Sequence, residues 1–188
     1  MDREEVIRRL PALNLIQDKT IRDRTAELSA EAPEYFWTVP ASTSGYHHPL
    51  CRGEHGLWAH TLMVCTAIER LVDSWEARFD VDPDYARTAG ILHDQRKNGD
   101  PASPSDTSVS DHDLRMGEII RRSDLPDEIA VAVDEHMGAW YDGPEPSNPL
   151  SELVHAADML ASTENATLAV PGPVPTELAA LGVEEASF

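Results

Sequence analysis

Apolar residues recur at helical spacing along much of this chain, and the same stripes carry histidines and an aspartate. In the segment from about 56 to 78, His60 stands four residues before Val64, on the side that Leu57 and Ile68 also share. That side of a helix faces the core, where an unpaired polar group is costly. The chain must therefore fold so that its buried polar side chains meet a suitable partner.

Five predicted helices carry side chains of this kind. They are His60 in 56 to 78, His93 with Asp94 beside it at the end of 83 to 94, His112 in the helix that begins near Ser110, His136 in the helix that ends at Gly138, and Asp158 in 150 to 162. Any one buried histidine is more often satisfied by a carbonyl or a carboxylate group. Six such residues need a common partner, because burying an unpaired carboxylate costs several kcal/mol.

A shared metal centre is the economical partner, because imidazole and carboxylate groups both bind divalent transition metals. Four ligands fill one ion and six suggest two. We expect one or two ions from among Fe, Mn, Zn, Ni and Co, with Mg as a further option.

The same periodicity predicts an all-α fold, a single-domain bundle of about six to eight helices, with no β alternation of useful length. Residues 1–44 are predicted to hold N-terminal helices and an aromatic loop that pack on the core. One of these helices spans 19 to 30, with Asp18 as its N-cap. Residues 45–165 form the metal-binding domain, and the proline-rich stretch 166–188 is predicted to be a loose tail.

The charge of the chain is unusual, because 34 acidic residues oppose 15 basic ones and the formal net charge is −19. This balance argues against an extended nucleic-acid surface, although it allows a nucleotide in a local pocket. We interpret the excess of acid as halophilic adaptation to high salt, where self-repulsion is screened.

No apolar run approaches the roughly 20 residues that a membrane span needs, and the charged start, Met1 to Glu5, precedes no apolar signal region. Cys51 and Cys65 stand at no zinc-finger or redox spacing and are expected to be buried or idle thiols. We expect a soluble cytoplasmic protein with no membrane partner. The sequence leaves a homo-oligomer open.

Two cations, Arg96 and Lys97, follow His93-Asp94 almost directly, and Lys97 is one of only two lysines in the chain. Cations at the end of a helix are also favoured by the helix macrodipole. Phosphate binding and a solvated helix end are therefore both consistent with this pair.

Two predicted loops flank these helices. Residues 98 to 110 have an irregular, Ser-, Asp- and Pro-rich composition, and long loops of this sort are often lids. The earlier loop, Pro33 to Pro49, contains His47 and His48, one of which can reach the metal centre or remain an ordinary loop histidine.

At this point the sequence resembles the HD superfamily of metal-dependent phosphohydrolases. The resemblance rests on GEHGLWAHTLMV (53–64), AGILHDQRK (89–97), SDHDLRMGEII (110–120), VDEHMGAW (133–140) and LVHAADMLAS (153–162). These motifs cover roughly residues 45 to 162.

The resemblance implies a helical fold of the HD-domain type with a defined ligand set. It implies one metal held by His60, His93, Asp94 and Asp158, and, in members with two metals, Asp94 as a bridge with His112 and His136 on the second ion. It also implies that His48, or its neighbour His47, lies where some relatives reach the substrate. Arg96 departs from the family pattern, because a glycine commonly follows His-Asp-x.

The expected activity is hydrolysis of a phosphate ester, a nucleotide or a small phosphodiester, by metal-activated water. Asp94 and Lys97 are the expected catalytic residues, and His48, Arg96 and Lys97 the expected substrate-binding ones. Two other functions stay open: a di-iron oxygenase of the same fold, and a sensor that binds metal and nucleotide without turnover.

Overall fold

The computed structural model describes residues 1–42, 45–140 and 143–188. Within them the fold is all-α, as predicted, apart from one very small sheet. The α-helices are α1 (Arg3–Arg9), α2 (Lys19–Ala30), α3 (Glu34–Thr38), α4 (Gly56–Phe79), α5 (Pro83–Leu92), α6 (His112–Arg121), α7 (Asp127–Asp134), α8 (Pro149–Ala161) and α9 (Thr176–Ala179). Two 3-10 helices, Pro11–Leu15 and Pro49–Arg52, and the parallel strands β1 (Ala169–Val170) and β2 (Glu184–Glu185) complete it.

Side-chain caps explain where several helices begin. Asp18 accepts hydrogen bonds from the backbone N–H groups of Thr20 and Ile21, so α2 begins where the sequence predicts. Asp82 caps α5 in the same way, and Asn148 caps α8. Both helices also begin with a proline, which has no N–H to leave unsatisfied in the first turn.

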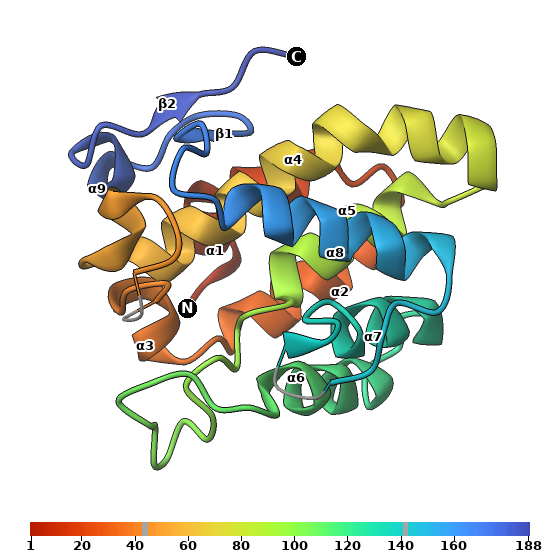
Figure 1. The fold of residues 1–188 in the computed structure, drawn as a ribbon, viewed down its shortest axis with the longest axis horizontal. Helices are drawn as coiled ribbons and strands as arrows, with labels where there is room; N and C mark the ends of the chain where they lie inside the picture. The colour runs from red at the N-terminus through yellow and green to blue at the C-terminus, as the bar shows by residue number, and fades with distance from the viewer. Residues whose placement is uncertain (43–44, 141–142) are drawn as a thin grey trace.

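Helix α4 is the long central element, and α5 and α8 pack along it (Figure 1). Helix α7 contacts both α5 and α8, and α6 pairs with α7 at the lower right of the view. The shared core contains fully buried side chains from α4, α5 and α7, among them Leu62, Ile68, Leu92 and Ile129. The C-terminal ends of α5 and α7 are thereby brought close to each other and to the N-terminal part of α4.

The described residues contain nine α-helices rather than the six to eight predicted. The short members are α3, with five residues, and α9, with four, and helices of one turn leave no periodicity to detect. Helix α3 falls in the stretch that was expected to be an aromatic loop. Its Trp37 does pack on the core as expected, with its ring centroid 5.5 Å from that of Trp58 on α4.

The C-terminal residues are part of the core, so the prediction of a loose tail is wrong. Val170 and Leu178 are fully buried, and Thr66 of α4 donates a hydrogen bond to the carbonyl oxygen of Ala169 at 2.8 Å. On the surface, Arg8 of α1 pairs with Glu177 of α9 at 3.0 Å. Prolines and isolated apolar residues gave no pattern from which this packing could be inferred.

Within the described residues, none of the helices combines the length and the apolar character that crossing a lipid bilayer requires. Cys51 and Cys65 are buried free thiols, as expected.

The buried tail predicts a stability effect. Leu178→Ala should lower the free energy of unfolding by about 2–5 kcal/mol, because it removes a fully buried side chain and leaves a cavity. Phe188→Ala is the matched control in the same tail, since that side chain is 67% exposed, and it should change stability by less than about 0.5 kcal/mol. Denaturant unfolding at fixed salt concentration measures both. Equal stability of the two variants would show that the tail does not contribute to the core.

Candidate metal centre

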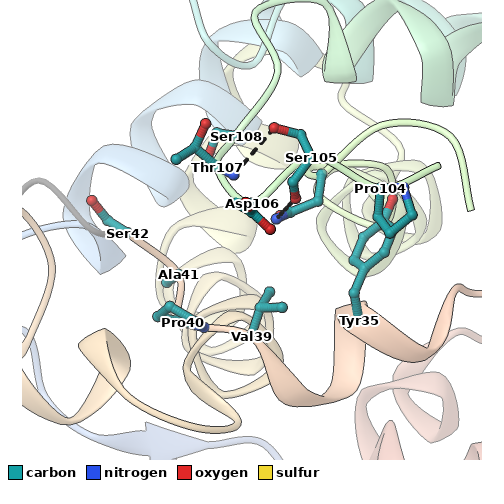
Figure 2. Close-up of a pocket in the computed structure, with 11 residues that line it drawn as sticks. Tyr35, Val39, Pro40, Ala41, Ser42, Pro104, Ser105, Asp106, Thr107 and Ser108 are labelled. Atoms are coloured by element: carbon teal, nitrogen blue, oxygen red, sulfur yellow. Dashed lines mark hydrogen bonds between the residues drawn. The ribbon is translucent and has the colours of Figure 1, made fainter.

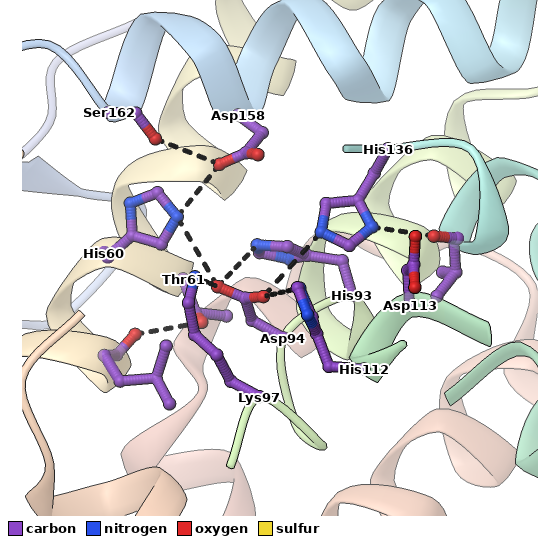
Figure 3. A network of polar contacts seen from close by, with 12 residues as sticks. His60, Thr61, His93, Asp94, Lys97, His112, Asp113, His136, Asp158 and Ser162 are labelled. Carbon is purple, nitrogen blue, oxygen red and sulfur yellow. Dashed lines mark hydrogen bonds and ion pairs between the residues drawn. The ribbon is translucent and has the colours of Figure 1, made fainter. Parts of the chain in front are cut away.

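The six predicted ligand residues come together in one buried cluster (Figure 3). His60 lies on α4 and Asp158 on α8, while His93 and Asp94 follow directly after the last residue of α5. His112 is the first residue of α6, and His136 lies in the turn after α7. None of the six side chains is more than 4% exposed. Five helices thus converge on one polar cluster inside an apolar core.

Three of the histidines are oriented by the same local device. The Nδ1 atom of His93 lies 2.8 Å from the carbonyl oxygen of Gly90, that of His112 lies 2.7 Å from the oxygen of Val109, and that of His136 lies 2.7 Å from the oxygen of Val133. A carbonyl oxygen only accepts, so each Nδ1 carries the proton and donates. In a neutral ring Nε2 then holds the lone pair, which is the tautomer that a metal ion requires.

Asp94 lies at the middle of the cluster. Its Oδ1 atom is 3.2 Å from Nε2 of His112 and 3.7 Å from Nε2 of His136, and its Oδ2 atom is 3.5 Å from Nε2 of His93. The Nζ atom of Lys97 is 2.5 Å from the same Oδ2. One carboxylate therefore contacts groups from three different parts of the chain.

His60 and Asp158 form the other side of the cluster. Nε2 of His60 is 3.0 Å from Oδ1 of Asp158 and 3.8 Å from Oδ2 of Asp94. The hydroxyl of Ser162 donates to the same Oδ1 of Asp158 at 3.3 Å, which orients the carboxylate toward His60.

The charges of the cluster hold both carboxylates ionised. Burial alone would raise the pKa of Asp94, but Lys97 and His93 keep it well below its ordinary value. Burial likewise acts against the charge of Asp158, and its contact with His60 lowers the pKa. Burial would lower the pKa of His93, yet Asp94 raises it. The cluster thus attracts positive charge to its centre.

These residues fit a metal ion. The Nε2 atoms of His60, His93 and His136 and Oδ1 of Asp94 are buried, and none makes a hydrogen bond with a described residue. A buried polar atom without a hydrogen bond is costly, and an ion at this point would satisfy several such atoms at once. Two overlapping groups place their ligand atoms within 4.8 Å of one another: His60, His93 and Asp158, and His93, Asp94 and His136. The donor set, imidazole and carboxylate, is that of divalent transition metals.

The two predicted phosphate-binding cations have different environments. Lys97 is only 8% exposed and contacts Asp94. Arg96 is half-buried and donates to the carbonyl oxygen of Gln95 at 3.4 Å, and within the described residues it forms no ion pair. Burial lowers its pKa, and Tyr35 is the nearby group that opposes this most. The sequence could not separate these neighbours, because the turn after α5 sends them in different directions.

The loop histidine that lies against the cluster is His47. Its ring centroid is 4.6 Å from that of His60, and burial lowers its pKa to about 3, so the ring is neutral. His47 has a positive φ of 73° and donates its backbone N–H to the carbonyl oxygen of Ser162 at 3.0 Å. In contrast, the ring of His48 accepts a hydrogen bond from the backbone N–H of Leu50 at 3.2 Å, in its own turn. His48 was the predicted substrate-binding residue, but in this geometry it is His47 that lies against the cluster.

A residue outside the predicted set, His155 on α8, supports the position of His136. Its Nδ1 atom donates to the backbone carbonyl oxygen of His136 at 2.6 Å. Gly138 has a φ of 56°, and a Cβ atom there would lie 2.9 Å from the ring of His155. Sequence spacing could not identify this contact, because His155 and His136 are 19 residues apart and lie in different segments.

The loop from 98 to 110 is anchored at both ends. The backbone N–H of Val109 donates to the carbonyl oxygen of Lys97 at 2.9 Å, and Tyr35 donates its hydroxyl to the carbonyl oxygen of Gly99 at 2.8 Å. Its role as a lid stays a prediction.

Comparison with known proteins agrees with this geometry. A profile of the HD domain matches residues 57–163, more than half of the 188-residue chain and the stretch that contains all six clustered residues. Neither the comparison with curated proteins nor that with solved structures found a match.

Metal binding should stabilise the fold. At a free metal concentration 100 times the dissociation constant, binding should raise the free energy of unfolding by about 2.7 kcal/mol. For a chain of this size, that corresponds to a rise of roughly 5–10 °C in Tm. Thermal unfolding with and without Mn²⁺ tests this for the wild type and Asp94→Asn. The wild-type Tm should rise and fall again with a chelator, and that of Asp94→Asn should not change with metal. If no transition metal changed the wild-type Tm, the assignment of this cluster as a metal centre would be contradicted.

His155→Ala should weaken metal binding by roughly 10–100-fold, because it removes the donor that fixes the backbone of His136. Calorimetric metal titration measures the change, and His155→Gln, which keeps a donor, should recover part of it. His48→Ala is the control, since its ring bonds only within its own turn among the described residues, and its affinity should stay within twofold of wild type. An unchanged affinity in His155→Ala would show that the hydrogen bond is structural only.

Proposed function

This chain belongs to the HD domain family, whose members are generally metal-dependent hydrolases, and we propose that it hydrolyses a phosphate ester at the buried His–Asp cluster. The observation that carries the proposal is the set of buried imidazole and carboxylate atoms that make no hydrogen bond of their own, with an ammonium group beside them. A purely structural buried network would satisfy its polar atoms within the protein.

The positions of the donor atoms suggest which residues would hold each ion. His60, His93 and Asp158 would hold one ion together with Asp94, and Asp94 would also serve a second site with His136 and with His112, which lies 3.2 Å from it. Divalent metal ions lower the pKa of bound water from 15.7 towards about 7 and stabilise charge on phosphoryl oxygens.

The protein's own groups would position the reactants. Asp94 is kept as a carboxylate by its cationic surroundings, and it would orient the water that attacks phosphorus. The ammonium group of Lys97 would offset the charge that develops on the phosphoryl oxygens. His47 is neutral, and its ring contacts that of His60, so it would shield this side of the cluster from bulk water.

The substrate we propose is a nucleotide or a small phosphodiester. The net charge of −19 repels a polyanion at long range, and only local positive charge at the site can offset this for a small phosphate. High ionic strength screens the repulsion, so turnover should be measured in high salt.

Lys97→Met tests the proposed role of the lysine. We expect wild-type metal content and a kcat that is roughly 100–1,000-fold lower, because the variant loses charge stabilisation at the phosphoryl group. Lys19→Met is the matched control, since Lys19 is the only other lysine and its side chain is 77% exposed. Metal analysis and a screen of phosphomonoesters, diesters and nucleotides in high salt provide both readouts.

Asp94→Asn completes the experiment. Wild-type protein should carry at least one metal per chain and hydrolyse a member of the screen, and the variant should do neither above background. Wild-type protein with less than one metal and no hydrolysis would exclude the proposal. Iron-dependent oxygen consumption would instead identify an oxygenase, and tight nucleotide binding without turnover would identify a sensor.

A further inference from the structure

A cavity of about 240 Å³ lies between the segment after α3 and the loop from 98 to 108 (Figure 2). It is smaller than the roughly 300–1,000 Å³ of pockets that enclose a whole drug-sized ligand. The cavity would therefore hold one part of a ligand rather than a whole drug-sized molecule. The residues that line it are Tyr35, Val39, Pro40, Ala41, Ser42, Asn98, Pro104, Ser105, Asp106, Thr107 and Ser108.

Two stretches of backbone lead from the walls of this cavity to residues that contact the metal centre. Asn98 lines the cavity and follows Lys97, which contacts Asp94. Ser108 lines the opposite part of the loop and precedes Val109, whose carbonyl oxygen accepts the hydrogen bond from Nδ1 of His112. The cavity and the metal centre are therefore joined through adjacent residues at two points of the chain.

Electrostatics also connect the two. Burial raises the pKa of Tyr35 to about 12, and the negative charge of Asp94 adds to this rise. The phenol ring, which lines the cavity, thus lies within electrostatic range of the carboxylate at the middle of the metal centre.

The lining suits a flat heterocycle attached to a sugar. One side is apolar, with Val39, Pro40 and Ala41, and Tyr35 adds an aromatic ring. The loop contributes hydroxyl groups, and among the described residues those of Thr107 and Ser108 have no hydrogen-bond partner. Asp106 is the one acidic residue among the described residues that line the cavity, and none of them is basic, so the cavity would repel a phosphate group rather than bind it.

We propose that this cavity binds the nucleoside part of the substrate, while its phosphate group reaches Lys97 and the metal centre. The inference rests on the proposed function, and it assigns a place in the fold to the nucleoside of the substrate proposed there. A free nucleotide and the terminal nucleotide of a short strand carry the same nucleoside, so the test includes both.

The first measurement is binding without chemistry. Adenosine and uridine are titrated into metal-loaded protein in high salt, and at least one should bind saturably to the wild type. Ser108→Leu fills the cavity and should weaken this binding at least tenfold. Ser103→Leu is the matched control, because Ser103 is an exposed residue of the same loop that does not line the cavity, and it should stay within twofold.

The second measurement is steady-state kinetics with two kinds of substrate. Ser108→Leu should raise KM at least tenfold for a nucleoside monophosphate and for a dinucleotide, and change KM for p-nitrophenyl phosphate less than twofold. A rise for only one of the two nucleotide substrates identifies the natural source of the nucleoside. Thr107→Leu, at an exposed position of the lining, is a second cavity-filling variant in case Ser108→Leu does not fold.

The outcomes separate this inference from the proposed function. Hydrolysis of p-nitrophenyl phosphate by protein that binds no nucleoside would overturn the inference and leave the function standing. Nucleoside binding that depends on Ser108, without any hydrolysis, would support the cavity as the nucleoside-binding site and exclude the proposed hydrolysis of phosphate esters. Loss of binding in Trp140→Ala but not in Ser108→Leu would overturn the inference. The nucleoside would then lie on the exposed rings of Tyr46 and Trp140, whose centroids are 5.8 Å apart.

Discussion

The buried carboxylate of Asp94 is the group on which the rest of this structure depends. It is 1% exposed, and removing a carboxylate from water costs several kcal/mol unless opposite charge and hydrogen-bond donors compensate. Lys97 and His93 approach it from the same turn, and His112 and His136 approach it from two other segments. The packing of α4, α5, α7 and α8 brings these groups within reach, so the fold and the site are stabilised by the same contacts.

A local device makes the cluster suitable for metal. His93, His112 and His136 each donate from Nδ1 to the carbonyl oxygen three residues earlier, which leaves Nε2 directed at the centre. For His93 this also satisfies the carbonyl oxygen of Gly90 near the end of α5, whereas the oxygen of Val133 also accepts the backbone N–H of His136. The Nδ1 hydrogen bond of His93 therefore completes the helix and prepares the ligand, while His155 performs the corresponding task for the backbone of His136.

Sequence periodicity predicted much of the fold and the composition of the cluster. The helix from 19 to 30 is confirmed residue for residue, because Asp18 marks its start in the sequence. The prediction of a loose C-terminal tail was wrong, because Val170 and Leu178 contact the core over long sequence separations. Such contacts leave no periodic pattern in the local sequence. His47 and His48 could not be separated either. They are adjacent loop residues, and only the positive φ of His47 turns its ring toward His60.

The sequence by itself determined that this chain is helical and that six metal-capable side chains lie on its buried faces, because helical spacing is a local property that each segment carries alone. Tertiary structure decided which atoms meet: that Lys97 rather than Arg96 reaches Asp94, and that the loop from 98 to 108 forms a cavity beside the metal centre. Those outcomes depend on the directions of turns and on contacts between distant segments. Neither has a signature within a single stretch of sequence.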